Sequence, residues 1–62
     1  MNRYFKSIEE LEEMGYTILN PANEAVVKHH IKREIDVYVT DDLRIESEAG
    51  IYLAEVSYEE PY

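Results

Sequence analysis

Residues 25–40, AVVKHHIKREIDVYVT, decide the fold, because the same stretch has features of a strand and of a helix. In an extended conformation, six of the eight odd positions are apolar, whereas only Val26 and Tyr38 are apolar at the even positions. Alternation of period two is typical of a half-buried strand. The pattern therefore favours one long, bent strand, with His29 pointing inward and His30 outward.

The first part of this stretch also fits a helix. Val27, Ile31 and Ile35 follow one another at helical spacing and would share one face. The second part, IDVYVT (35–40), is rich in β-branched residues, and no Gly, Asn or Pro precedes it to end a helix. The alternative fold is a central helix at 21–34 over a smaller antiparallel sheet.

The segment NPAN (20–23) is compatible with both folds. It fits a turn in which Pro21 fixes φ and Asn20 bonds its own backbone. It fits equally a helix start, with Asn20 as the cap and Pro21 in the first turn.

The clearest element is a short helix in SIEELEEMGY (7–16). Ser7 followed three residues later by Glu10 is a capping box, which satisfies two backbone amides at the start of a helix. Gly15 can adopt the left-handed conformation after the last turn, with Tyr16 packing back on Leu11. A helix this short is unstable alone, so we expect it to dock on a sheet.

The remaining segments predict short strands joined by turns. YTIL (16–19) is β-prone and is expected to pair with the first half of the long strand. Asp41 and Asp42 form a turn into LRIES (43–47), and EAG (48–50), with Gly50 left-handed, leads into IYLAEVSY (51–58). Pro61 then ends the pairing. The predicted fold is α+β, in which a short N-terminal helix packs on a curved antiparallel sheet of four or five strands, within one domain at 1–62.

Composition excludes several classes of protein. The 62 residues include no cysteine, which removes disulfides, thiolate nucleophiles and cysteine zinc sites. Hydrophobic residues make up 45% of the chain, which favours a folded domain. No apolar run is long enough for a signal peptide or a membrane span, so we expect a soluble, cytoplasmic protein that contacts no membrane.

The net charge of -8 lies entirely in one half of the chain. Residues 1–33 hold five acids and five bases, whereas residues 34–62 hold nine acids and a single base, Arg44. The C-terminal half is therefore predicted to carry a strong negative field.

No arrangement of residues predicts catalysis, a cofactor or a metal. His29 and His30 would point to opposite faces of a strand, and on a helix His30 and Glu34 would lack a third ligand. A catalytic pair of carboxylates needs two different environments, whereas the carboxylates here are all expected to be exposed. The segment TDDLRIESEAG (40–50) lacks the ligand spacing of a calcium loop. We therefore expect a protein that is not an enzyme.

Direct nucleic-acid binding is also not predicted. One basic cluster, KHHIKR (28–33), lies in a chain whose total charge repels phosphate. Its cations are expected to pair across strands with acids of the C-terminal half.

The six tyrosines are the remaining signal, because tyrosine combines a large apolar area with a polar tip and is favoured in interfaces. If the acids of the C-terminal half line the even face and the turns of the sheet, they would steer a basic partner toward tyrosines among them. The candidate partner-binding residues are Asp36, Tyr38, Asp41, Asp42, Glu46, Glu48, Tyr52, Glu55, Tyr58, Glu59 and Glu60.

The expected function is a non-enzymatic, acidic module that binds a protein with a basic surface. If that surface normally holds nucleic acid, the module would inhibit by charge mimicry. Small acidic inhibitors that phages make against host nucleases and other defence systems are comparable in size and charge only. The alternative is a structural homodimer or a small subunit of a larger assembly, because a small core and open sheet edges leave surface to cover.

Overall fold

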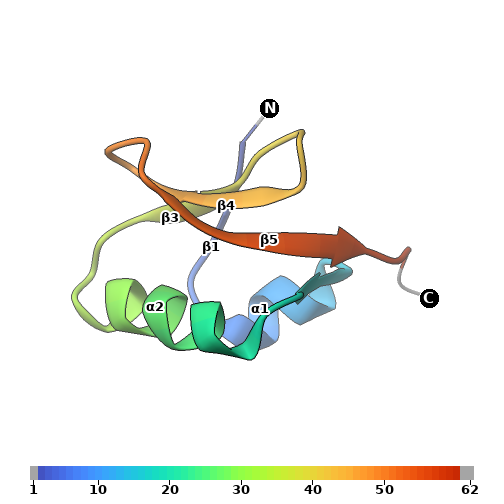
Figure 1. Ribbon diagram of the computed structural model, residues 1–62, viewed down its shortest axis with the longest axis horizontal. Helices are drawn as coiled ribbons and strands as arrows, with labels where there is room; N and C mark the ends of the chain where they lie inside the picture. The colour runs from blue at the N-terminus through green and yellow to red at the C-terminus, as the bar shows by residue number, and fades with distance from the viewer. Residues whose placement is uncertain (1, 61–62) are drawn as a thin grey trace.

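Two helices lie on one side of a curved, five-stranded antiparallel sheet in the computed structural model, which describes residues 2–60 (Figure 1). The strands are ordered β1-β3-β4-β5-β2 across the sheet. This arrangement confirms the predicted α+β class and the helix packed on a curved sheet. In chain order the elements are β1 (Arg3–Phe5), α1 (Ile8–Glu13), β2 (Tyr16–Ile18), α2 (Pro21–Lys32), β3 (Val37–Val39), β4 (Arg44–Ser47) and β5 (Tyr52–Tyr58).

Helix α1 begins and ends as its sequence predicts. The Ser7 hydroxyl accepts a hydrogen bond of 3.0 Å from the amide of Glu10. The Glu10 carboxylate accepts a hydrogen bond of 2.8 Å from the amide of Lys6. In an ideal capping box the donor would be the amide of the cap residue, Ser7. Gly15 has a φ of 99°, and its amide donates to the carbonyl of Glu12 at 2.9 Å. The left-handed glycine therefore ends the helix and turns the chain into β2.

The long strand favoured over residues 25–40 is wrong, because residues 21–32 form helix α2. The side chain of Asn20 accepts a hydrogen bond of 3.0 Å from the amide of Ala22, and Pro21 occupies the first turn. NPAN is thus a helix start and not a turn. Only Val27 is fully buried on this helix, with Ile31 packed at the edge of the core, so one narrow stripe at helical spacing outweighs the alternation.

Helix α2 ends at a left-handed residue that is not glycine. Glu34 has a φ of 62°, and its amide donates to the carbonyl of Ile31 at 2.9 Å. The amide of Ile35 donates to the carbonyl of His30 at 3.0 Å. These two bonds are those of a Schellman ending. The helix therefore stops before IDVYVT without the Gly, Asn or Pro that the sequence lacks.

The sheet pairs differently from the prediction as a result. Strand β2 pairs with the second half of β5, with Thr17 opposite Ser57, because the segment expected to pair with it is helical. Strand β3 is an interior strand, paired with β4 on one side and with β1 on the other. Strand β1 was not predicted from the sequence.

Both predicted hairpin turns are present. Asp41 and Asp42 lie at the tip of the β3–β4 turn, which the amide of Thr40 closes by donating to the carbonyl of Arg44 at 2.8 Å. Gly50, with a φ of 82°, lies in the β4–β5 turn. The predicted role of Pro61 lies outside the described residues.

The core fills the space between the helices and the inner face of the sheet. Leu11 of α1 and Val27 of α2 are both fully buried there. They meet the buried side chains of the sheet, which include Phe5, Tyr16, Val37, Val39, Ile45, Leu53, Ala54 and Val56.

Candidate functional site

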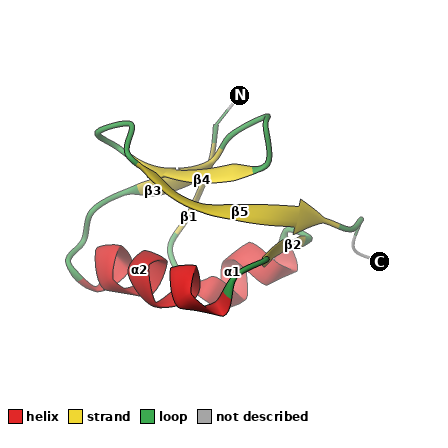
Figure 2. Cartoon of the chain, viewed as in Figure 1, coloured by secondary structure: helices red, strands yellow, loops and turns green. Residues whose placement is uncertain are grey.

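The face of the sheet opposite the helices, called the outer face below, is the candidate site. Val37 and Val39 of β3 are buried in the core, so the alternation of a strand places Tyr38 on the opposite face. Figure 2 shows both helices below the sheet, on the side opposite the outer face. Within residues 2–60, no helix therefore covers the outer face.

A row of four side chains crosses the outer face, one from each of four neighbouring strands. Tyr4 is opposite Tyr38, Tyr38 is opposite Glu46, and Glu46 is opposite Tyr52. The rings of Tyr4 and Tyr38 are tilted with their centres 5.2 Å apart. Tyr4 is 53% exposed and Tyr52 47% exposed, whereas Tyr38 between them is buried. The row therefore has two exposed aromatic ends and a packed middle.

The carboxylate in this row is held by two partners. The Tyr38 hydroxyl donates a hydrogen bond of 3.2 Å to Glu46 Oε1. Arg44 Nη2 lies 3.8 Å from Glu46 Oε2 and 3.2 Å from Asp42 Oδ2, so it links the outer face to the β3–β4 turn. Glu46 is therefore fixed in place before any partner arrives.

Both tyrosines beside acids on this face keep their protons more firmly than usual. Burial raises the pKa of Tyr38, and the hydrogen bond and charge of Glu46 raise it further. Burial also raises the pKa of Tyr52, together with the negative charge of Glu55. At neutral pH the outer face thus presents neutral phenols among carboxylates.

A bulge in β5 decides which residues of that strand join the outer face. Ile45 is opposite Ala54 and Glu46 is opposite Tyr52, so Leu53 is an extra residue on β5. Leu53 and Ala54 are both buried, and the alternation shifts by one from there. Glu55 consequently lies opposite Arg44 on the outer face.

The same shift removes Tyr58 from the outer face. Tyr58 is opposite Tyr16 of β2, and the two rings are tilted with centres 5.0 Å apart. Tyr16 belongs to the core, so Tyr58 packs at the helix side of the sheet while remaining 51% exposed.

The predicted site residues are therefore divided among five places. The structure brings Tyr38, Glu46, Tyr52 and Glu55 together on the outer face, with Asp42 joined to them through Arg44. Asp36 lies just before β3, where its carboxylate is 3.2 Å from Lys6 Nζ. The others lie in the two turns or at the end of β5: Asp41, Glu48, Tyr58, Glu59 and Glu60.

Sequence reasoning missed Tyr4 as part of this surface. A strand of three residues is too short to show a period, and its partner β3 is distant in the sequence. The only available signal was the aromatic side chain itself.

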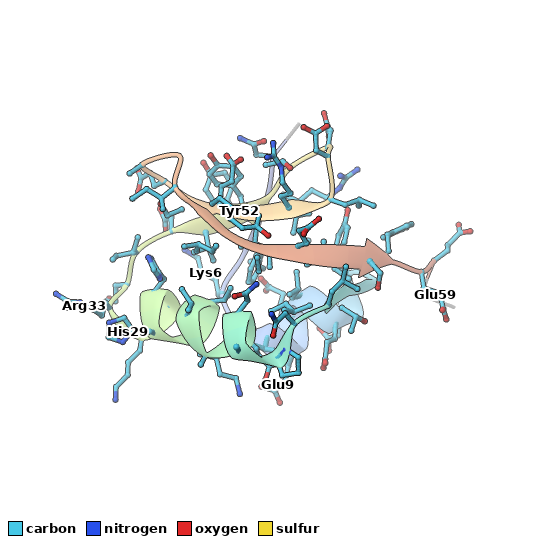
Figure 3. The ribbon with its side chains drawn as sticks, viewed as in Figure 1. Lys6, Glu9, His29, Arg33, Tyr52 and Glu59 are labelled. Carbon is cyan, nitrogen blue, oxygen red and sulfur yellow. The ribbon has the colours of Figure 1, made fainter. Side chains whose placement is uncertain are left out.

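The basic cluster lies on α2 and at its C-cap, and contrary to the prediction its cations do not pair across strands within residues 2–60. Lys28 Nζ is 3.5 Å from the Glu24 carboxylate one helical turn earlier. His30 Nδ1 is 2.9 Å from the carbonyl oxygen of Val26, while His29 points outward at the end of α2 (Figure 3). Within residues 2–60, no three His, Asp or Glu side chains are grouped so that they would hold a metal ion.

Comparisons with known proteins do not assign a function to this surface. No family model, no characterised protein and no solved structure matches the chain. In the described part of the chain, neither helix is long and apolar enough to span a membrane.

Proposed function

We propose that the protein is a non-enzymatic binding module whose outer face docks on a basic surface of another protein. The row Tyr4–Tyr38–Glu46–Tyr52 is the observation that carries this proposal. It combines exposed aromatic area with acids that are already positioned, on the one face of the sheet that the helices leave open.

The two exposed tyrosines supply the contact area. Tyr4 and Tyr52 stand at either end of the row and have little conformational freedom to lose on binding. Aromatic side chains of this kind are frequent energetic centres of interfaces.

The carboxylates supply specificity and rapid encounter. Glu46 lies in the row and Asp42 and Glu55 lie beside it, and within residues 2–60 Arg44 is the one basic residue that pairs with these acids. Complementary charge raises association rates and selects basic partners, and salt weakens both effects. If the partner's basic surface normally holds nucleic acid, occupation by this face would inhibit it.

Affinity capture followed by biosensor kinetics tests the proposal. The partner is captured from a lysate of the native host at low and high salt, and binding is then measured with purified components. The variant Tyr4→Ala/Tyr52→Ala is expected to lose at least tenfold in affinity. Tyr58→Ala is the matched control, because Tyr58 is similarly exposed but lies off the outer face.

Charge is tested separately. Neutralising Asp42 and Glu55 to Asn and Gln is expected to slow association more than it speeds dissociation. Neutralising Glu12 and Glu13 to Gln changes the net charge equally on the exposed side of α1 and should leave binding unchanged. Equal effects of the two pairs would show that only net charge matters and would contradict docking by the outer face.

The alternative is a structural homodimer or small subunit that assembles through apolar surface. Ile51 and Leu19, which are 59% and 60% exposed, are the side chains that such an assembly would cover. Under this alternative Ile51→Ser and Leu19→Ser disrupt assembly, and the outer-face variants are silent.

A further inference from the structure

The C-terminal end of α2 and its cap residue carry three exposed cations, two of which form no ion pair within residues 2–60. Lys28, Lys32 and Arg33 are exposed, and only Lys28 has an ion pair, with Glu24 of the same helix. Neither Lys32 nor Arg33 forms an ion pair with any residue of 2–60. Figure 3 shows Arg33 and His29 directed outward at one end of the molecule.

A groove runs between this part of α2 and the start of α1. It has a volume of about 350 Å³, and its apolar lining comes from Ile8 and Ile31. Lys28 and Lys32 stand on its α2 side, and Ser7 and Glu9 on its α1 side. An apolar groove with two lysines on its rim is complementary to an acidic segment that also carries apolar area.

The chain contains such a segment at the end of β5, outside the groove. Tyr58, Glu59 and Glu60 are exposed. The amide of Glu59 donates to the carbonyl of Gly15 at 2.8 Å, so the segment leaves the body beside the end of α1. Figure 3 places Glu59 at the end of the long axis opposite Arg33, and the molecule extends 31 Å along that axis. Tyr58 is also paired with Tyr16 of β2, so the structure holds the segment at the end of α1, and none of residues 58–60 lines the groove of their own chain. The exposed side chains of Glu59 and Glu60 are therefore placed to meet the groove of another copy.

We propose that the groove between α1 and α2 takes the acidic segment Tyr58–Glu60 of a second copy, so that molecules associate head to tail. The contact does not use the outer face and does not depend on the function proposed for it. Because the two surfaces differ, the contact is heterologous and adds one molecule after another unless a ring closes. The association is weak, because exposed ion pairs contribute little and the net charge of -8 opposes it.

Nucleic acid is a poorer occupant of this groove. The lining residues Ile8 and Ile31 are aliphatic, whereas bases bind to single-stranded nucleic-acid proteins by stacking on aromatic rings.

A charge-swap experiment in the intact chain tests the proposal by sedimentation velocity. The wild type is expected to increase in average mass with concentration. Lys28→Glu/Lys32→Glu and Glu59→Lys/Glu60→Lys are each expected to remain monomeric, because each places like charges in the contact. An equimolar mixture of the two variants should associate again, since each variant now complements the other. Glu12→Lys/Glu13→Lys changes charge to the same extent outside the contact and should still associate.

The other outcomes would overturn the proposal. The proposal is wrong if the wild type stays monomeric up to millimolar concentration. It is also wrong if the two contact variants associate as the wild type does, or if their equimolar mixture stays monomeric. Binding of a labelled single-stranded oligonucleotide that Lys28→Glu/Lys32→Glu abolishes, without self-association of the wild type, would assign the surface to nucleic acid. Circular dichroism checks that each variant folds. None of these residues lies on the outer face, so partner binding there is tested independently.

Discussion

The hydroxyl of Tyr38 donates a hydrogen bond to the carboxylate of Glu46 across strands β3 and β4, at 3.2 Å. The two residues are direct neighbours in the sheet, and Tyr38 is only 8% exposed. A phenol in this position is held neutral by burial and by the adjacent negative charge, and both raise its pKa. The pair therefore fixes a tyrosine and an acid at the centre of the proposed docking face.

The first prediction concerns the ionisation of Tyr38. Glu46→Gln keeps an acceptor for the phenol but removes the charge, so the pKa of Tyr38 should fall toward its ordinary value of 10.0 without reaching it, because burial remains. Titration of tyrosinate absorbance measures this shift, with Tyr38→Phe identifying the contribution of Tyr38 to the curve. If the Glu46→Gln curve is the same as the wild-type curve, Glu46 does not raise the pKa of Tyr38 and the role assigned to it is contradicted.

The same pKa shift makes stability depend on alkaline pH. The folded state holds the Tyr38 proton more tightly than the unfolded state, so unfolding releases a proton once the pH exceeds about 10. The free energy of unfolding should accordingly fall as pH rises from there through the folded pKa. Urea unfolding at several alkaline pH values should show a shallower fall for Glu46→Gln than for the wild type.

The second prediction concerns the end of α2. Glu34 is left-handed, a conformation that costs a residue with a side chain about 1 kcal/mol relative to glycine. Glu34→Gly should therefore raise the free energy of unfolding by about that amount. Lys32→Gly, in the last helical residue, is the matched control and should lower it by about 1 kcal/mol. Destabilisation by Glu34→Gly in urea unfolding would contradict the Schellman ending.

Glu34 also explains why the sequence predicted only part of the fold. The cap at Ser7, the stop at Gly15 and the turn at Gly50 were predicted because each uses the residue type that its geometry prefers. Helix α2 ends on a residue that disfavours its own conformation, so no stop signal is visible there. The helix is ended instead by the backbone hydrogen bonds that the amides of Glu34 and Ile35 donate to its last carbonyls.

The candidate site was predictable in composition but not in arrangement. Charge counting identified the acidic half, and Tyr38, Glu46 and Tyr52 do share a face. Glu55 lies on the outer face only because of a bulge at Leu53, and no residue type in the sequence indicates that bulge. Tyr4 joins through pairing between segments far apart in the chain, which sequence periodicity does not detect.

The third prediction tests how α2 packs. Val27 is fully buried whereas Val26 is 41% exposed on the same helix. Val27→Ala should lower the free energy of unfolding by about 2 kcal/mol through lost burial and a cavity. Val26→Ala should change it by less than about 0.5 kcal/mol. A chain of 62 residues has a total stability of only about 3–9 kcal/mol, so urea unfolding resolves the difference.

The exposed position of His29 allows a check against the strand that the sequence favoured. That strand would direct His29 into the core, whereas on α2 the residue is exposed. His29→Ala should therefore leave the unfolding midpoint unchanged, and a loss comparable to that of Val27→Ala would favour the strand.

The fourth prediction is that divalent metal ions do not stabilise the fold. His29 points outward, and one ring nitrogen of His30 already lies 2.9 Å from the carbonyl oxygen of Val26. Thermal unfolding should be unchanged by stoichiometric zinc or calcium, because an ion that binds only the folded state would raise the midpoint. A sharp rise at one equivalent, abolished by His29→Ala/His30→Ala, would establish a histidine site.

The last prediction concerns the cap of α1, which has only six residues and depends on its ends. Ser7→Ala removes the acceptor for the amide of Glu10 and should lower the free energy of unfolding by about 1 kcal/mol. Ser57→Ala is the matched control, because Ser57 is exposed on β5, and its effect should stay within about 0.5 kcal/mol. Ser7→Asp should restore stability, since aspartate caps as well as serine and its charge favours a helix start. Urea unfolding of the three variants decides the matter: if Ser7→Ala and Ser57→Ala are equivalent, docking of Leu11 alone holds the helix in place.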